Sequence, residues 1–553
     1  MSAEVLARLA ARHLDLVRAP FTLPSSRLLV FRDDMANDPH AAASGIRIHT
    51  AEYEKPLDAC RVIDRLEVRA ADGRPRTVVD VLPDRIVFDG GASLTYAGPT
   101  AVSVAAPNGA QVAWTLPDGT RDTVESPAGD QIAVRIEVGR DRSVMAARSA
   151  THDADQAATS ATWREWFERC PIVRDDLQEM TAFCWWVLGA NIVALPRLGD
   201  VRAVVPSKIG YVGLWQWDAY FIATGLRHGD PALAREQLDL ALRFPTSDGQ
   251  LPDVVHEAGT LASSDDLPAA DREHLRRDGS AVADADAPIP LTKPPLTAWA
   301  VRKLLEVAPD DEWARKVLPV IERSQDWWFA HSDADGDGMP EYAHPYSSGL
   351  DDSPIFDGTL PIASPDLGAY LVLQDLELAE LCEQLNTGDP LAHRRRAHHT
   401  MTLLRRMWHP EQHAFLAGSR PTDAVVGLMP LLTGMLSPDI VGHLTDALSD
   451  PARYGTLWGL PTVAVDDSDF SPERMWRGPV WINTNVLVAE GLERSGLHTS
   501  ARRLREHTVR LVIHGGGPHE YFNPRTGQKA RAATTAFGWS AALFVDLAVR
   551  LSA

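Results

Sequence analysis

Two loop segments carry carboxylates within runs of glycine and proline. They are Gly349-Leu350-Asp351-Asp352-Ser353-Pro354 and Gly515-Gly516-Gly517-Pro518-His519-Glu520-Tyr521-Phe522. Cleavage of a glycosidic bond uses two carboxyl groups that flank the bond, and an inverting enzyme keeps them about 6.5–9.5 Å apart to admit a water. Two loops that meet at one cavity supply such a pair, so the sequence predicts glycoside hydrolysis. Each acid also fits a structural role, Asp351 or Asp352 as a turn or helix cap and Glu520 as a surface acid.

Tryptophans stand beside charged residues in two further segments, Trp215-Gln216-Trp217-Asp218 and Trp476-Arg477-Gly478-Pro479-Val480-Trp481. Indole rings pack on the apolar face of a sugar, and neighbouring charges bind its hydroxyl groups. Trp217 with Tyr220 and Phe221 also forms an apolar helix face, which is ordinary core packing. Packing does not explain Asp218, because a buried carboxylate needs hydrogen-bond donors such as sugar hydroxyls. Arg477 has two interpretations, a ligand of a carboxylate in the site or half of a structural ion pair.

Residues 333–341 have oxygen donors at alternate positions and a glycine at the sixth, as in the first half of a calcium-binding loop. The candidate ligands are Asp333, Asp335, Asp337, Met339 and Glu341. His344 stands at the twelfth position, where such loops usually carry a bidentate glutamate, so the ligand ring is incomplete. Two interpretations stay open, a structural Ca²⁺ ion that stiffens the loop before Asp351 and a polar turn that caps the preceding helix. No other cofactor is expected.

Composition describes an ordinary globular protein. Of its 553 residues, 45% are hydrophobic and 23% are charged, which is enough to bury a large core. The net charge of −21 argues against nucleic acid or an anionic membrane as a partner, because no basic stripe neutralises phosphates. The four cysteines show no CxxC spacing and therefore indicate reduced thiols. Without a signal-peptide pattern or an apolar run of about 18 residues, the expected location is the cytoplasm, and the expected partner is a small carbohydrate.

Residues 1–155 contain short apolar runs separated by turn signals. Residues 132–138 alternate apolar and polar side chains, which predicts a strand with one buried face. Asn108-Gly109 and Asp118-Gly119 are among the strongest short signals for hairpins. The sequence therefore predicts an N-terminal β-sandwich domain.

Residues 156–553 show helix-length apolar periodicity instead. About twelve candidate helices are present, among them residues 297–307 and a weaker segment near Val426. The long loops between them hold nearly every cluster of aromatic and acidic residues, and binding sites usually concentrate in such loops. The pattern predicts a mostly α chain whose second domain is a toroid of helix pairs.

Five ordered segments resemble one known family. They are residues 206–218, 293–295, 344–351, 476–483, and 520–524 together with 537–540. In this order they resemble glycoside hydrolase family 63, whose members are (α/α)₆-barrel α-glycosidases related to trehalases. The resemblance is strongest to its bacterial mannosylglycerate and glucosylglycerate hydrolases. It extends from about Val204 to the C-terminus and implies an (α/α)₆ catalytic domain.

The resemblance implies roles for the acids. Asp351 is the general acid, Glu520 is the general base that activates water, and Asp218 binds hydroxyl groups of the sugar in the −1 subsite, so that hydrolysis proceeds with inversion. The other residues placed around the substrate are Trp215, Trp217, Tyr346, Gly349, Asp352, Trp476, Arg477, Trp481, Tyr521 and Trp539. Many relatives carry Glu-Ser-Gly before the acid and an arginine two residues past the serine that follows it. This chain has Ser347-Ser348-Gly349 and Ile355-Phe356 there, close to the catalytic acid, so the resemblance leaves the aglycone open.

The favoured function is inverting hydrolysis of an α-glucosidic linkage in an oligosaccharide or small glucoside. The alternatives are an α-mannosidase, a hydrolase of another α-glycoside such as a glycerate-type compatible solute, and a non-catalytic carbohydrate-binding protein. Both acids in their expected loops argue against the last, and Glu520 argues against phosphorolysis, in which a phosphate site replaces the base. A bell-shaped pH profile is expected, because burial raises the pKa of the acid while the base stays ionised.

Overall fold

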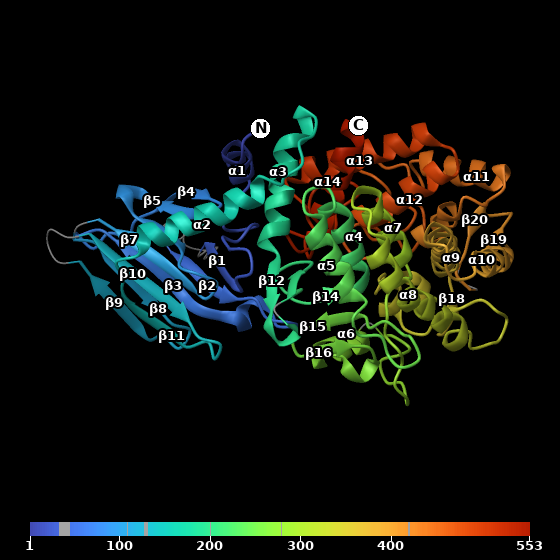
Figure 1. The fold of residues 1–553 in the computed structure, drawn as a ribbon, viewed down its shortest axis with the longest axis horizontal. Coiled ribbons are helices and arrows are strands. Elements are labelled where there is room, and N and C mark those ends of the chain that lie inside the picture. Colours follow the sequence, from blue (N-terminus) through green and yellow to red (C-terminus); the bar gives the residue numbers. More distant parts are fainter. Residues whose placement is uncertain (33–44, 108, 127–130, 200, 278, 419–420) are drawn as a thin grey trace. The chain divides into compact units, whose positions relative to one another are not determined.

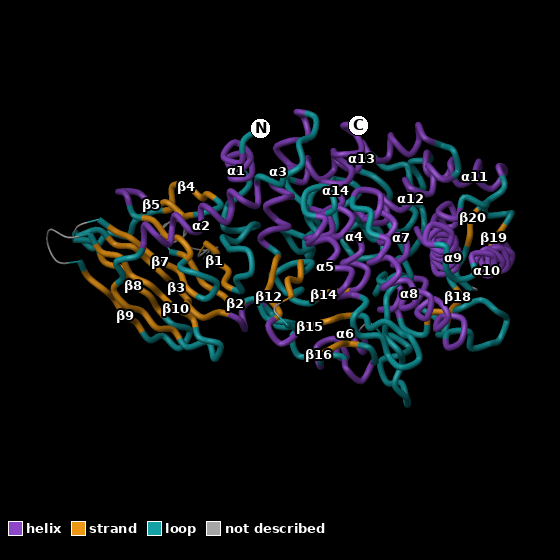
Figure 2. The backbone as a smooth tube through the Cα atoms, viewed as in Figure 1, coloured by secondary structure: helices purple, strands orange, loops and turns teal. Residues whose placement is uncertain are grey.

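A computed structural model shows the chain folded into two compact units, Met1–Val212 and Gly213–Ala553. The structure describes residues 1–32, 45–107, 109–126, 131–199, 201–277, 279–418 and 421–553. Figure 1 and Figure 2 show that the first unit is rich in strands and the second is rich in helices. Within the described ranges, no helix is long and apolar enough to cross a membrane.

The first unit contains two antiparallel sheets. One has five strands in the order β1-β2-β3-β8-β9, and the other has six in the order β11-β10-β7-β6-β5-β4. The strands are β1 Leu28–Arg32, β2 Ile46–Thr50, β3 Arg61–Arg69, β4 Val78–Leu82, β5 Arg85–Phe88, β6 Ser93–Tyr96, β7 Ala101–Ala106, β8 Gln111–Thr115, β9 Arg121–Glu125, β10 Ile132–Val138 and β11 Val144–Arg148. Burial alternates along β10, as in a strand with one face on a core. The predicted N-terminal β domain is confirmed.

The turn at Asp118-Gly119 joins β8 to β9 as expected. Gly119 has a φ of +86°, a conformation that glycine adopts without steric cost. The side chain of Asp118 accepts a hydrogen bond of 2.8 Å from the backbone N–H of Thr120, which stabilises the turn. Asn108, in the other predicted turn, lies outside the described residues.

Helices follow the last strand within the first unit. α2 (His152–Phe167) packs on β6 and β7, and the ring of His152 shares hydrogen bonds of 3.0 Å with Ser93 and with Ser103. α3 (Asp175–Ala190) and the hairpin of β12 (Ile192–Leu195) and β13 (Val201–Val204) complete the unit. The change of sequence pattern near residue 155 follows β11, the last strand of the two sheets. The compact unit continues to Val212: α2 packs against the sheet, and α3 packs against α2 and against α1 (Ala3–Ala11).

The second unit is a closed ring of helix pairs. The inner segments are α4 (Gln216–Leu226), α7 (Thr297–Val307), α9 (Pro365–Leu385), η8 (Val425–Thr433), α12 (Ile482–Arg494) and α14 (Gly538–Ser552), and each contacts the next until α14 returns to α4. The outer helices that follow them in sequence are α5 (Pro231–Ala241), α8 (Asp311–His331), α10 (Pro390–Leu404), α11 (Pro438–Ser449) and α13 (His498–Gly515). Every residue of α4 is buried, as expected for an inner helix. The predicted toroid is confirmed.

The weak helix expected near Val426 is a 3₁₀ segment, η8. Pro430 lies inside it and has no backbone N–H to donate to an α-helical hydrogen bond. All residues of η8 are buried between α9 and α12, so packing holds this segment in the inner ring.

The alternation of inner and outer helices places the predicted site residues at one end of the ring. Because an outer helix returns the chain between successive inner segments, the inner segments run in one direction, and their N-terminal ends lie together. The loops that lead into these ends carry Lys293 before α7, Asp351 before α9, Trp476 before α12 and Glu520 before α14. The topology therefore brings these four loops and the segment with Asp218 at the start of α4, all far apart in sequence, into one site.

A buried charge cluster ties the inner helices to one another. Asp546 of α14 accepts hydrogen bonds from Arg227 at 3.0 Å and from Arg550 at 2.9 Å. Glu490 of α12 lies 2.8 Å from Lys303 and 3.2 Å from Arg550. Burial by itself would raise the pKa of both acids, but the neighbouring cations outweigh it. The pKa of Asp546 is therefore lowered, and that of Glu490 is about 2.

Asp546→Asn is expected to destabilise the fold by about 3 kcal/mol, because Arg227 and Arg550 lose an anion that they share in the core. A carboxyl with a lowered folded pKa stabilises the protein only while it is ionised. In the same cluster, the wild type should lose the stabilisation that Glu490 contributes as the pH falls from about 4.5, the pKa of a glutamate in the unfolded chain, towards its folded pKa of about 2. Denaturant unfolding at pH 7 and pH 3 measures both effects. The control is Asp439→Asn, at a side chain that is 88% exposed, which should change the free energy of unfolding by less than about 0.5 kcal/mol. Equal stability of the Asp546 and Asp439 variants would contradict the expectation.

Candidate active site

Asp351 lies just after the 3₁₀ segment η5 (Pro345–Ser348) and is partly buried. Its Oδ1 is shielded from solvent and has no hydrogen-bond partner within the described part of the chain. Desolvation and the carboxylates of Asp352 and Asp271 raise the pKa of Asp351 to about 6, against the lowering effect of Lys293. A carboxyl group that keeps its proton close to neutral pH suits a general acid.

A buried ion pair, which no sequence motif indicates, acts on this acid. Nζ of Lys293 is 3.1 Å from Oδ1 of Asp253, and the two side chains are 4% and 3% exposed. Nζ also donates a hydrogen bond of 2.6 Å to the carbonyl of Tyr346. The charge of Lys293 acts on Asp351 and Asp218 as well as on Asp253. The only sequence signal was the proline-flanked position of Lys293, and Asp253 had none, because its partner lies far along the chain.

Glu520 is 3% exposed, in the loop between α13 and α14. Its Oε2 accepts a hydrogen bond of 2.8 Å from the N–H of Thr534, and its own N–H donates to the Thr534 carbonyl at 2.9 Å. Burial raises the pKa of Asp218 well above its usual range, and the charge of Glu520 adds to that increase. Asp218 also interacts with Lys293, which interacts with Asp351. The two predicted catalytic acids therefore belong to one cluster of interacting charges.

Five of the predicted aromatic residues form one packed cluster. Ring centroids lie 5.4 Å apart for Trp217 and Trp539, 6.1 Å for Trp217 and Trp476, 3.6 Å for Trp476 and Trp481, and 4.8 Å for Trp481 and Tyr521. All five are buried, so most of their surface is used in packing against one another. Nε1 of Trp539 is buried without a hydrogen-bond partner among the residues described. The cluster joins the start of α4, the loop before α12 and the Glu520 loop.

The acid loop is held against this cluster at two points. A Cβ atom at Gly349 would lie 2.2 Å from Cζ2 of Trp217, so only glycine permits this close approach. Asp352 accepts hydrogen bonds from the backbone N–H of Trp476 at 2.8 Å and from a guanidinium Nε at 3.1 Å. The carboxylate of Asp352 thus positions the loop before α12, whereas Asp351 keeps an oxygen that, among the described residues, has no protein partner. Of the two acids, Asp351 therefore has the oxygen that is available to a ligand.

Arg477 forms a two-point ion pair with Asp357, with 2.7 Å between Nη1 and Oδ2. Asp357 directly follows η6 (Pro354–Phe356), so the pair connects the acid loop with the loop before α12. Of the two interpretations of Arg477, the structure shows the ion pair. Its Nε is buried and has no hydrogen-bond partner in the described ranges, so one donor remains for a ligand.

Two further predicted residues flank these groups. Trp215 ends β14 (Leu214–Trp215), directly before α4, and is partly buried. Tyr346 lies in η5, with its ring centroid 4.8 Å from that of His344. Asn483, near the start of α12, was absent from the predicted set, yet it is fully buried and neither atom of its amide has a partner within the described residues. Buried polar groups are nearly always hydrogen-bonded, so Asn483 is available to a polyhydroxyl ligand.

The acidic loop 333–341 gathers its carboxylates as a cation site would. Oxygens of Asp333, Asp335 and Asp337 lie within 4.8 Å of one another and accept hydrogen bonds from backbone N–H groups of the same loop. Burial raises the pKa of Glu341, and repulsion from the three aspartates adds to the increase. The side chain of Met339 is buried, which leaves its carbonyl as the ligand atom. This donor set fits a hard cation such as Ca²⁺.

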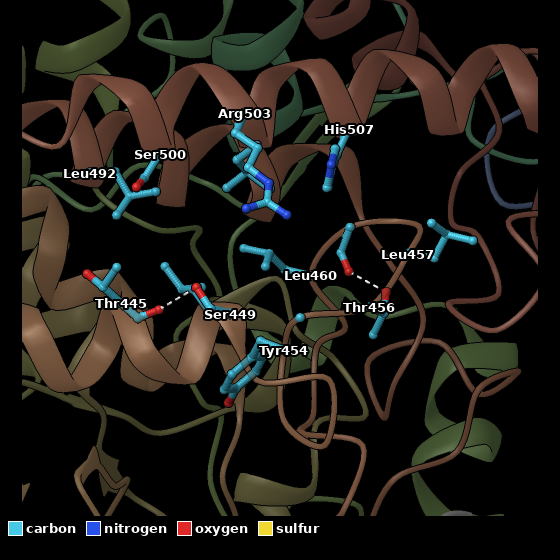
Figure 3. A pocket seen from close by; sticks show the side chains of 14 residues that line it. Thr445, Ser449, Tyr454, Thr456, Leu457, Leu460, Leu492, Ser500, Arg503 and His507 are labelled. Atoms are coloured by element: carbon cyan, nitrogen blue, oxygen red, sulfur yellow. Dashed lines mark hydrogen bonds between the residues drawn. The ribbon is translucent and has the colours of Figure 1, made fainter.

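A cavity of about 420 Å³ lies between α11, α13 and the loop that contains Tyr454. Figure 3 shows Arg503 and His507 pointing into it from one helix. The residues that line this cavity include no carboxylate and none of the predicted site residues. The acid chemistry therefore belongs to the end of the ring where the inner helices begin.

The family model of the mannosylglycerate hydrolase MGH1-like glycoside hydrolase domain matches residues 211–540. The chain belongs to glycoside hydrolase family 63. Its match begins close to the boundary between the two compact units, so the N-terminal β unit lies outside the family model.

Relatives of this family 63 chain agree with the assignment. A mannosylglycerate hydrolase of Thermus thermophilus is 27% identical over 423 residues, which are 64% of this chain and 98% of the relative. A glucosylglycerate hydrolase of Mycolicibacterium hassiacum is 23% identical over 462 residues, which are 65% of this chain and 97% of the relative. The crystal structure of a family 63 mannosylglycerate hydrolase from Thermus thermophilus, with Tris and D-glycerate, has a TM-score of 0.55 and 26% identity and covers 66% of this chain and 98% of its own. The chain is a glycoside hydrolase whose (α/α)₆ barrel follows an N-terminal β domain in the sequence.

Proposed function

We propose that this family 63 enzyme cleaves an α-glycosidic bond with inversion, with Asp351 as general acid and Glu520 as general base. Asp351 gives its proton to the glycosidic oxygen, and the C1–O bond breaks with its electron pair passing to that oxygen. Glu520 takes a proton from a water molecule, whose oxygen attacks C1 from the opposite face. One observation carries this proposal. The carboxyl of Asp351, whose pKa is raised, has an Oδ1 without a hydrogen-bond partner among the described residues, and this carboxyl belongs to the same charge cluster as the buried Glu520.

The sugar would lie between these acids and the aromatic cluster. Asp218 and Asp253 are buried acids whose raised pKa values, about 7 for Asp253, suit hydrogen bonds with sugar hydroxyls. The buried polar groups of Trp539 and Asn483, which have no partner in the described part of the chain, supply further donors and acceptors. A polyhydroxyl ring satisfies such a mixed set of buried groups, and this supports a sugar in the −1 subsite.

The substrate that we propose is a glycerate-type α-glycoside, in place of the α-glucosidic oligosaccharide favoured from the sequence. The two relatives are a mannosylglycerate hydrolase and a glucosylglycerate hydrolase, so their substrates share glycerate and differ in the sugar. Near the acid, Arg477 pairs with Asp357 and Lys293 pairs with Asp253. A substrate carboxylate would have to share one of these cations. The matching glycerol glycosides, which lack the carboxylate, are therefore the control substrates.

The test is hydrolysis of α-mannosylglycerate, α-glucosylglycerate and the two glycerol glycosides, with the anomer of the fresh product read by NMR. The expected result is a β-anomer and a kcat/KM at least about tenfold higher for a glycerate glycoside, equivalent to about 1.4 kcal/mol. An α-anomer as first product would overturn inversion. Turnover only of neutral glucosides such as trehalose, kojibiose, nigerose or isomaltose would overturn the glycerate assignment, and turnover of none of these compounds would overturn the catalytic proposal.

Lys293→Met is expected to move the alkaline limb of the kcat profile to higher pH. Desolvation raises the pKa of Asp351 to about 6, and the ammonium group of Lys293 opposes this increase because it favours the ionised carboxylate. Without that charge the pKa rises further, and Asp351 keeps the proton that it must donate up to a higher pH. Initial rates between about pH 4 and pH 9 measure the shift. Lys316→Met, at an exposed position on α8, provides the control; an unmoved alkaline limb in the Lys293 variant would contradict this coupling.

We also propose that loop 333–341 binds a structural Ca²⁺ ion through its three aspartates, Glu341 and the Met339 carbonyl. Calcium at a hundred times its Kd would then stabilise the protein by about 2.7 kcal/mol and raise the Tm by a few degrees. Asp335→Ala should abolish this rise, because it removes an acidic ligand while the loop keeps its glycines. Thermal melting with calcium, with magnesium and with chelator measures the effect. An equal rise in wild type and variant would assign the stabilisation to another site.

A further inference from the structure

Three helices of the second unit bring a cysteine, a glutamate and a histidine together, away from the acids. Glu322 lies on α8, Cys382 near the end of α9 and His393 on α10. Oε1 of Glu322 is 3.4 Å from Nε2 of His393 and 3.8 Å from Sγ of Cys382. The three ligand atoms all lie within 4.8 Å of one another. These are three side chains of the types that bind zinc, at distances at which one ion can reach them all.

A fourth residue orients the histidine. Nδ1 of His393 lies 2.8 Å from Oδ1 of Asp375, whose side chain is fully buried. Arg396 donates two hydrogen bonds of 2.8 Å to the same carboxylate and balances its charge. With Nδ1 bonded to Asp375, the other ring nitrogen faces Glu322 and Cys382. Metal-binding histidines commonly show this arrangement, in which a carboxylate fixes the ring through its second nitrogen.

We propose that Glu322, Cys382 and His393 bind a zinc-type divalent metal ion. Zinc takes sulfur at about 2.3 Å and nitrogen or oxygen at about 2.0–2.2 Å in a tetrahedron, which corresponds to edges of about 3.5 Å between sulfur and oxygen and about 3.3 Å between nitrogen and oxygen. The observed edges of 3.8 Å and 3.4 Å are close to these values. Binding forms bonds from the metal to thiolate, carboxylate and neutral imidazole, and the thiol and imidazolium protons pass to solvent. A water completes the tetrahedron.

The turn between α9 and α10 closes over two of the ligands. Gly388 has a φ of +69°, and a Cβ atom there would lie 2.8 Å from Sγ of Cys382 and 3.3 Å from Oε1 of Glu322. The backbone therefore approaches the cluster more closely than a side chain would permit. The side chain of Glu322 remains 30% exposed, which leaves a path for the ion. A metal here would clamp the helical hairpin whose first helix follows the loop of Asp351.

A proton on His393 is the competing occupant of the cluster. Burial lowers the pKa of His393, but hydrogen bonds to Asp375 and Glu322 outweigh this and raise it to about 9. The metal-free protein therefore holds an imidazolium between two carboxylates, which is an ion pair without any metal. The two occupants predict different spectra for the thiol of Cys382, because only the metal converts it to a thiolate.

Titration of the full-length, chelator-treated protein with Co²⁺ tests the proposal. The expected result is one equivalent of cobalt with a thiolate-to-metal charge-transfer band, displaced by one equivalent of zinc. Cys382→Ser should lose the band, and His393→Gln should weaken binding at least about tenfold. His398→Gln, on an exposed face of the same helix, should leave the band unchanged.

Other outcomes separate this site from its competitors. Asp335→Ala removes any cobalt bound at the acidic loop and should leave the thiolate band intact. No charge-transfer band in the wild type would overturn the proposal even if the Cys382 variant failed to fold, because that measurement needs no variant. A band that persists in a folded Cys382→Ser protein would assign the metal to another thiol and would overturn it as well.

Discussion

Glu520→Gln should lower kcat by about 10³-fold on every substrate. The amide oxygen can still accept the hydrogen bond that the Thr534 N–H donates to Oε2 at 2.8 Å in the wild type, so the loop stays in place. The amide cannot take a proton from water, and general base catalysis by a positioned carboxylate contributes about 10²–10⁴-fold. KM should change much less, because the sugar keeps its contacts with the rest of the site. Initial rates over a range of substrate concentrations separate the two constants.

A neighbouring glutamate provides the matched control for this variant. Glu473 accepts hydrogen bonds from the side chain of Asn523 and from the N–H of Arg531, at 2.7 Å for the latter, and so holds the same loop from outside the charge cluster. Glu473→Gln should lower kcat by less than about tenfold, the effect of one weakened hydrogen bond. Similar losses in the two variants would mean that loop structure, and not proton transfer, explains the effect of Glu520→Gln.

Asp351→Asn should lower kcat by about 10²–10⁴-fold on a glycoside with an alcohol leaving group and far less on the glycosyl fluoride of the same sugar. An alkoxide leaves poorly without a proton, whereas fluoride leaves without one. Asparagine has nearly the shape of the aspartate, so the loop that packs on Trp217 should keep its conformation. The measurement is the ratio of kcat on the glycoside with an alcohol leaving group to kcat on the α-glycosyl fluoride, for wild type and for Asp351→Asn.

The adjacent acid tests whether this dependence on the leaving group belongs to one position. Asp352→Asn loses part of the bonding that holds the N–H of Trp476, so a loss of activity is expected there too. That loss should be of the same size on both substrates, because in the proposed mechanism Asp352 donates no proton to the leaving group. If the fluoride rescued Asp352→Asn and not Asp351→Asn, the general acid would be Asp352 and not Asp351. The fluoride should not rescue Glu520→Gln, because attack by water still lacks its base.

Much of the fold was predictable from local pattern. β10 and α7 begin and end at the residues expected, Ile132–Val138 and Thr297–Val307, because their apolar periodicity is uninterrupted. β9 (Arg121–Glu125) was not predicted, since none of its side chains is buried and its sequence shows no apolar alternation. η8 departed from the expected α-helix because the proline inside it removes a donor, and burial alone holds the segment.

The site was predictable where one segment carries both the residue and its context. The loops of Asp351 and Glu520 and the tryptophan segments stand out by composition, and the structure brings them to one end of the ring. Lys293 with Asp253 was not predictable as a functional pair, because neither residue is unusual until the two are 3.1 Å apart. The cluster of Cys382, Glu322 and His393 was invisible for the same reason, since its members come from three helices.

The sequence by itself determined the β domain, the helical periodicity, and the loops in which acids and tryptophans occur, because each depends on residues close together in the chain. Only the tertiary structure decided that Asp351 keeps an oxygen without a partner among the described residues, whereas Asp352 binds the loop before α12. It also decided that Lys293 is the cation that opposes the rise in the pKa of Asp351. Asp351 and Asp352 are neighbours in sequence, yet the charge of Lys293 acts on the first, whereas the second binds the N–H of Trp476. Hydrogen-bond partners and pKa values depend on groups that distant segments bring within a few ångströms, and these are settled by how the inner helices close into a ring.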